Sequence, residues 1–274
     1  MKIFKKIIEF YVFSNLHVSL SVVCLVLVSG KLFKKLVLIE ALFLGCITFI
    51  GYHLIRYSNR FKYGKLHALE NFSNQYKKII WLVNGIAIVV SLSMLLKFQF
   101  SQLLKLLPFG ILTLAYAFSF VKIKGKIRSI RYLPGFKIFI IALVWSGSIV
   151  FFPFEYEEKT KLYFIELLFF MIAYTLPFDI RDLNFDDKVV KTLLMILGIE
   201  KTKYLGTTLL GLSTALHFYI FKDLYLLQYL IICIVVVVVV VVLFLIKSTS
   251  DQSKYFCSLW VEGIPILYYL FCIV

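Results

Sequence analysis

Long apolar runs recur from one end of this 274-residue chain to the other, and they constrain its fold more than any other feature. A run of about 18 or more apolar residues is long enough to cross a bilayer as a helix. Hydrophobic residues make up 61% of the sequence and charged residues 16%, whereas a soluble domain carries about 25% charged residues. A transmembrane barrel would show weak alternating segments of about 10 residues instead. The sequence therefore predicts an all-α, polytopic helical bundle in a membrane.

The formal net charge of +15 does not indicate a nucleic-acid-binding protein. The basic residues lie in short connectors between apolar runs, where orientation signals are found, and no soluble basic stretch is interleaved with aromatic residues. The five cysteines fall inside apolar runs and form no metal-ligand spacing with the histidines, so we expect buried packing there. They are Cys24, Cys46, Cys233, Cys257 and Cys272. We expect membrane lipids, and no nucleic acid, as partners.

We expect about nine transmembrane helices in a single domain that covers residues 1–274. Glu9, Asn15 and His17 interrupt the first apolar run, so we interpret it as a retained helix rather than a cleaved signal peptide. The run 235–242 is β-branched but is predicted helical in lipid, where every backbone group needs an internal partner. The predicted spans lie near 9–30, 36–56, 79–97, 101–121, 135–153, 162–178, 203–221, 225–246 and 254–274.

The basic residues also predict the orientation of the bundle. Most of the 30 Lys and Arg residues fall on one side of the membrane if the N-terminus is cytoplasmic, and cytoplasmic loops carry an excess of these residues. We therefore expect a cytoplasmic N-terminus and an outside C-terminus, in an integral protein of the bacterial inner membrane.

An acidic cluster follows the sixth predicted span, in the stretch YTLPFDIRDLNFDD. Asp179, Asp182 and Asp186 are spaced i, i+3 and i+7, which places their carboxylates on one face of a helix. Like charges so placed need a counter-charge, which a divalent cation, basic side chains or water can supply. Carboxylates often bridge Mg²⁺ to a substrate phosphate, so the interpretations are a Mg²⁺–diphosphate site and a solvated loop.

The wider stretch YTLPFDIRDLNFDDKVVKTLLMILG resembles the second aspartate-rich motif of the UbiA superfamily of intramembrane prenyltransferases. Members often read Tyr-Ser/Thr, two residues, Lys-Asp, two residues, Asp, three residues, Asp, then Lys/Arg-Thr-Leu and Leu-Gly. The matching positions here are Tyr174, Thr175, Asp179, Asp182, Asp186, Lys191, Thr192, Leu193, Leu197 and Gly198. In sequence detail the resemblance covers about 25 residues, and in layout the whole chain.

The resemblance implies a fold, a chemistry and a site. The family has nine helices, a cytoplasmic N-terminus and a cavity that opens to the cytoplasm, with this motif after the sixth helix. Its members transfer a prenyl group from a prenyl diphosphate, which Mg²⁺ ions hold against two aspartate clusters. By resemblance, Asp179, Asp182 and Asp186 would hold Mg²⁺ here.

The first aspartate cluster of the family is replaced in this chain. Members read Asn-Asp-x-x-Asp-x-x-x-Asp at the end of the second helix, where this chain reads GYHLIRYSNRFK. With Tyr52 set against the family Asn, the three carboxylate positions become His53, Arg56 and Arg60. A second departure is Phe178, where members often have Lys.

This change of sign leaves two interpretations of the site. Arg56 and Arg60 either neutralise the Asp cluster directly, which would close a former catalytic mouth, or they bind a phosphate bidentately while the Asp cluster keeps one Mg²⁺. The first interpretation predicts no catalysis and the second permits it.

Other polar residues are candidates for a cavity lining or a phosphate contact. Tyr174 belongs to the motif, and Glu262 is a mid-span carboxylate beside a Gly-Pro break that frees backbone groups. Lys122 and Lys124 lie in a basic connector whose family counterpart supplies basic residues to the diphosphate. No role is predicted for His217.

Two functions follow from these observations. The first is a UbiA-like prenyltransferase that moves a prenyl group from an isoprenoid diphosphate to an aromatic or lipid acceptor, with Mg²⁺ as a possible cofactor. The alternative is a catalytically inactive relative that binds an isoprenoid or other lipid, or acts as a scaffold for a membrane protein partner.

Overall fold

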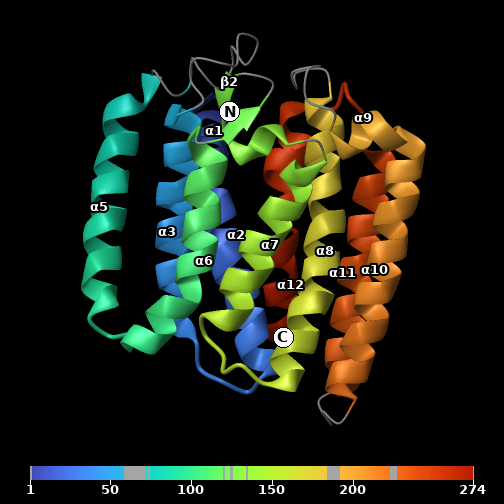
Figure 1. Ribbon diagram of the computed structural model, residues 1–274. Helices are drawn as coiled ribbons and strands as arrows, with labels where there is room; N and C mark the ends of the chain where they lie inside the picture. Colours follow the sequence, from blue (N-terminus) through green and yellow to red (C-terminus); the bar gives the residue numbers. More distant parts are fainter. Residues whose placement is uncertain are drawn as a thin grey trace.

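The computed structural model shows an elongated bundle of helices with roughly parallel axes (Figure 1). It describes residues 2–58, 72, 75–119, 121–123, 126–133, 135–183, 192–222 and 227–273, with backbone only for 2, 56–58, 121–123, 126–128, 132, 227–233 and 236. The two termini lie at opposite ends of the bundle (Figure 1). We call the end that carries the N-terminus, β2 and α9 the N-terminal end.

The helices follow the apolar runs closely. They are α1 (Lys2–Phe13), α2 (Leu16–Leu32), α3 (Leu38–Ser58), α5 (Lys77–Leu95), α6 (Phe100–Ala117), α7 (Phe136–Phe151), α8 (Glu158–Asp182), α9 (Leu193–Leu197), α10 (Ile199–Phe221), α11 (Leu227–Lys247) and α12 (Ile264–Ile273). A 3₁₀ turn, η1 (Ile130–Tyr132), precedes α7, and a π-helix, η2 (Phe256–Val261), precedes α12. Strands β1 (Val121–Ile123) and β2 (Lys126–Arg128) form a small antiparallel hairpin with Val121 opposite Arg128.

Within the described residues, five helical segments are long and apolar enough to cross a membrane. They are Leu38–Ile55, Lys77–Leu95, Phe100–Ala117, Glu158–Asp182 and Phe256–Ile273, and the bent pair α1–α2 makes up to six. Each of the nine predicted spans overlaps a helix of the bundle, but the number nine is not confirmed by this criterion. The predicted all-helical membrane architecture is confirmed.

Helix α8 forms the centre of the bundle and contacts α7, α10 and α11. About 67% of its span is buried, against 17% for α5 and α6, whose apolar side chains face outward as expected for contact with lipid. The predicted helical state of the valine run is also observed. Val237, Val241 and Leu245 recur at i, i+4 and i+8 on α11 and are fully buried against the core.

Two breaks interrupt helices that lie next to each other. Asn15, with φ 76°, separates α1 from α2, and the two helix axes differ by 59°. In η2 the hydrogen bonds widen to i→i+5, and the Leu259 carbonyl accepts from the Gly263 backbone N–H at 3.0 Å. His17 Nε2 donates to the Leu259 carbonyl at 2.9 Å, and Ser21 donates to the Glu262 carbonyl. At the η2 break, two backbone carbonyls therefore accept hydrogen bonds from side chains of α2.

Close helix packing generates a test of the fold. A Cβ on Gly206 of α10 would lie 2.5 Å from Leu245 Cδ2 and 2.6 Å from Leu176 Cδ1, whereas a Cβ on Gly211 meets nothing within 4 Å. Gly206→Ala should lower the free energy of unfolding by about 1–3 kcal/mol because two side chains must move. Gly211→Ala, the matched control on the same helix, should cause no loss. Thermal unfolding in detergent measures both, and equal effects would contradict this packing.

Candidate functional site

A cavity of about 670 Å³ lies inside the bundle, between α2, α3, α5, α6, α7 and α8. Its walls are mainly apolar and aromatic, with Leu44, Leu106, Ile140, Trp81 and Trp145 among the lining residues. A volume in this range matches the pockets that hold small-molecule ligands and cofactors. The cavity can therefore enclose a hydrocarbon chain of moderate length.

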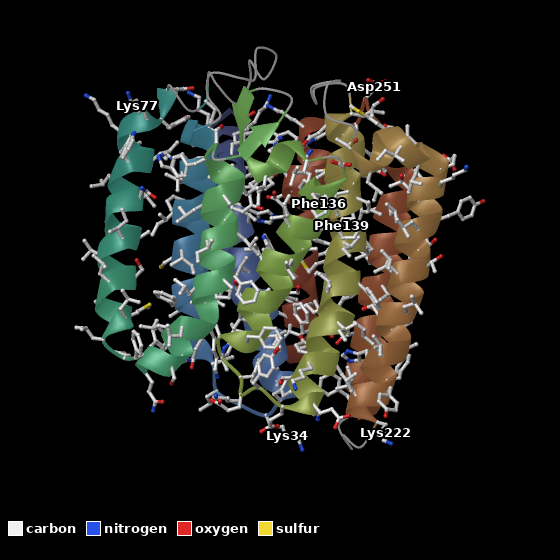
Figure 2. The ribbon with its side chains drawn as sticks, in the orientation of Figure 1. Lys34, Lys77, Phe136, Phe139, Lys222 and Asp251 are labelled. Atoms are coloured by element: carbon white, nitrogen blue, oxygen red, sulfur yellow. The ribbon has the colours of Figure 1, made fainter. Side chains whose placement is uncertain are left out.

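Four basic side chains line the cavity, from element ends that lie at the N-terminal end of the bundle (Figure 1). Lys77 begins α5, Arg131 belongs to η1, Lys137 lies in the first turn of α7, and Arg181 lies in the last turn of α8. Figure 2 shows Lys77 at this end, opposite Lys34 and Lys222. We call these four residues the basic mouth. They place positive charge at one end of an apolar cavity.

The acidic cluster of α8 meets the basic mouth directly. Lys137 Nζ lies 3.1 Å from Asp179 Oδ1 and 3.4 Å from Asp182 Oδ2, and so bridges two carboxylates one helical turn apart. Arg181 Nε lies 2.9 Å from Asp182 Oδ1. The Asp179 side chain is only 2% exposed, so its charge depends on this ion pair far more than a surface carboxylate would.

Several predicted site residues lie outside the described part of the chain. These are Asp186, Arg60 and Lys124, together with the side chains of Arg56 and Lys122. The predicted pairing of Arg56 and Arg60 with the Asp cluster therefore stays a prediction. The partners that the structure does show for Asp179 and Asp182 are Lys137 and Arg181.

The other predicted residues line the cavity. His53 of α3 faces Trp81 edge-on, with ring centroids 5.3 Å apart. Tyr174 of α8 lies 6.3 Å from the Trp145 ring, and Glu262 comes from the turn after η2. The structure thus brings His53, Tyr174, Glu262 and the two described aspartates to one cavity.

The sequence analysis assigned no site role to Lys137, Arg181, Trp81 or Trp145. Lys137 counts in the sequence only as one of the basic residues that set orientation, because a basic residue at a helix start looks the same whether it sets orientation or pairs with a carboxylate. Arg181 directly precedes Asp182, and that adjacency was the one available signal of an internal counter-ion. Nothing in the sequence distinguished the two tryptophans from lipid-facing ones.

Polar residues away from the cavity have partners of their own. Glu9 accepts hydrogen bonds from Lys254 Nζ at 2.9 Å and Tyr255 at 3.0 Å, and the bond to Glu9 raises the pKa of Lys254. His217 Nδ1 lies 3.4 Å from Glu166 Oε1 between α10 and α8, both side chains being buried. His217, to which no role was assigned, therefore belongs to a buried pair whose acidic member the sequence analysis did not single out.

The residues that the structure describes do not complete a metal site. Among them no group of three or more His, Cys, Asp or Glu side chains could hold a metal ion, and Asp179 and Asp182 are already ion-paired. Asp186, the third predicted Mg²⁺ ligand, lies outside the described residues.

Comparisons with known proteins place the fold. No protein-family model and no curated protein matches the chain. Among solved structures, the chain is similar to a UbiA homolog from Archaeoglobus fulgidus that was determined with GPP and Mg²⁺ bound. The TM-score is 0.62 at 13% identity, over 97% of this chain and 98% of that one.

The chain is thus an integral membrane helical bundle with a UbiA-like fold. The resemblance that the acidic motif suggested extends over nearly the whole length of the backbone. At 13% identity the likeness concerns the fold, and the chemistry of the site has to be argued from this chain's own residues.

The Lys137 bridge predicts a large and specific loss of stability. Lys137→Met would remove the ion pair of the buried Asp179 carboxylate and should lower the free energy of unfolding by about 3–5 kcal/mol. Lys105 makes a pair of the same 3.1 Å length with Glu155, whose side chain is 76% exposed, so Lys105→Met should cost about 0–1 kcal/mol.

A second substitution separates charge pairing from simple loss of packing. Asp179→Asn combined with Lys137→Met should recover much of the lost stability, because the stranded charge is removed. Thermal unfolding of the single and double variants measures this coupling. Additive losses would show that the two side chains do not act as a pair.

Proposed function

We propose that the protein binds an isoprenoid diphosphate in this cavity and transfers its prenyl group to an acceptor. The observation that carries the proposal is the cavity itself, whose walls are mainly apolar and whose N-terminal end carries four basic side chains against the two carboxylates of Asp179 and Asp182. An isoprenoid diphosphate has the matching polarity, an apolar chain with an anionic head. A structure of the same fold that holds GPP supports the choice of ligand.

Binding at the basic mouth would prepare the diphosphate to leave. In the transfer, the allylic C–O bond breaks, the diphosphate takes the electron pair, and the acceptor forms a new bond to carbon and loses a proton. Arg131 and Arg181 can donate paired hydrogen bonds to phosphate oxygens and stabilise the charge that develops there. The apolar walls would keep water away from the allylic cation, and the Trp145 face can stabilise it electrostatically.

Mg²⁺ at Asp179, Asp182 and Asp186 stays a prediction of the family resemblance. The described geometry supports Lys137 as the counter-ion in place of Mg²⁺, since its ammonium group lies between the carboxylates of Asp179 and Asp182. If diphosphate binding requires added Mg²⁺, the metal takes part in holding the diphosphate. If binding persists in EDTA, the side chains of the basic mouth hold it without a metal.

One observation favours a second candidate, a lipid-binding relative that does not catalyse transfer. The Lys137 bridge neutralises carboxylates that would otherwise attract a metal, as expected for a former catalytic mouth. Such a protein would hold an isoprenoid lipid, or support a protein partner in the membrane, without releasing diphosphate.

Geranyl diphosphate binding tests the proposal. Trp81 and Trp145 line the cavity, so binding should change the intrinsic fluorescence, and Trp145→Phe should reduce that change. Arg131→Gln should weaken binding roughly 10- to 100-fold, because a charge-assisted hydrogen bond contributes about 1.5–3 kcal/mol. Lys222→Gln, at the opposite end of the bundle, is the control and should have no effect (Figure 2).

Release of inorganic diphosphate from bound geranyl diphosphate, with a membrane lipid extract as the acceptor source, separates the two candidates. Binding with release supports the transferase, and binding without release selects the non-catalytic relative. Absence of binding both with Mg²⁺ and in EDTA would overturn the transferase.

A further inference from the structure

Three buried polar atoms in the cavity lining have no hydrogen-bond partner among the residues that the structure describes. They are Ser14 Oγ, Asn15 Oδ1 and the Tyr174 hydroxyl, and each of these residues is only 2% exposed. A buried polar group without a partner costs about 1–3 kcal/mol, and native proteins contain few of them. A concentration of three in the lining of one cavity is typical of a site whose partner is a ligand.

Asn15 shows the anomaly most clearly. It occupies the position just before α2, where an Asn side chain normally accepts a hydrogen bond from the first turn of the helix, but it makes no such cap. Its backbone is in the left-handed region with φ 76°, a conformation that Asn tolerates better than most residues. The break between α1 and α2 thus presents the amide to the cavity instead of to the helix.

This group of polar atoms is distinct from the basic mouth. Tyr174 precedes Arg181 by seven residues on α8, which corresponds to roughly 10 Å along the helix axis. Glu262, also in the lining, interacts electrostatically both with Tyr174 and with Arg181 of the basic mouth. Its carboxyl group therefore disfavours a second anion beside Tyr174, whereas a neutral group meets no such repulsion.

We propose that Ser14, Asn15 and Tyr174 form a second ligand subsite, which binds the hydroxyl or N–H group of a neutral, otherwise apolar molecule. The requirement for a donor comes from Asn15 Oδ1, which can only accept a hydrogen bond, while the two hydroxyls can either donate or accept. This inference rests on the proposed function to the extent that the subsite shares its cavity with an isoprenoid chain.

A matched pair of probes tests the requirement for a donor. 4-Propylphenol and 4-propylanisole differ in one hydrogen-bond donor, and Trp145 fluorescence can report either, since its ring centroid lies 6.3 Å from that of Tyr174. The phenol should bind at least about fivefold more tightly than the anisole, the factor that one hydrogen bond of about 1 kcal/mol provides. Equal affinities would overturn the subsite.

Two variants test which side chains of the protein accept the hydrogen bond from the phenol O–H. Asn15→Gly keeps the left-handed backbone and removes the amide, and Tyr174→Phe removes one hydroxyl. Each should reduce the phenol-to-anisole ratio several-fold, and Tyr174→Phe should not lower the unfolding temperature because that hydroxyl has no partner to lose. The control is Tyr163→Phe, whose hydroxyl lies 2.7 Å from Ser29 Oγ outside the cavity. It should lower stability and leave the ratio unchanged.

Geranyl diphosphate binding to the unmodified protein keeps the two proposals apart. If geranyl diphosphate binds but the phenol is not preferred, or if both variants retain the preference, the subsite is wrong and the proposed function stands. If the phenol preference exists and responds to both variants while geranyl diphosphate does not bind, the subsite stands and the proposed function fails.

Discussion

The ion pair between Lys137 and Asp179 is the interaction on which the arrangement at the N-terminal end of the bundle depends. A carboxylate that is 2% exposed at the end of a membrane helix needs a counter-charge, and Lys137 supplies it while also contacting Asp182. This bridge joins the start of α7 to the end of α8. It thereby positions Lys137 and Arg181, half of the basic mouth, at the opening of the cavity.

The same requirement for internal partners explains the helix breaks. The regular hydrogen-bond pattern is interrupted at η2, and His17 and Ser21 of α2 donate to the backbone carbonyls of Leu259 and Glu262 there. Asn15, at the neighbouring break, keeps an amide oxygen without a partner in the cavity lining. The carbonyls at the η2 break have hydrogen-bond donors and stabilise the fold, whereas the Asn15 amide oxygen has none among the described residues and is a candidate ligand contact.

The sequence predicted the fold class well because lipid imposes a simple rule on apolar segments. The span predicted near 203–221 corresponds to α10, Ile199–Phe221, and the span near 36–56 to α3, Leu38–Ser58. The exact number of spans was harder to predict, because some apolar helices, such as α7 with Phe136–Phe151, are too short to meet the length criterion for a span.

The sequence predicted the acidic residues of the candidate site but not their basic partners. Asp179 and Asp182 stood out by their spacing, but their partner Lys137 lies 42 residues earlier than Asp179 and resembled an ordinary orientation signal. Glu166 and His217 were missed as a pair for a similar reason, since 51 residues separate them in sequence. Pairings of this kind depend on helix packing, which the sequence pattern does not encode locally.

The central claim is that the cavity holds an isoprenoid chain with its anionic head at the basic mouth. Mass spectrometry of the lipids retained by the protein after mild purification tests it most directly. The account predicts an isoprenoid phosphate or diphosphate in a fixed ratio to the protein, reduced in Arg131→Gln and unchanged in Lys222→Gln. Retention of bulk membrane phospholipids alone, in the same proportions for all three proteins, would contradict it.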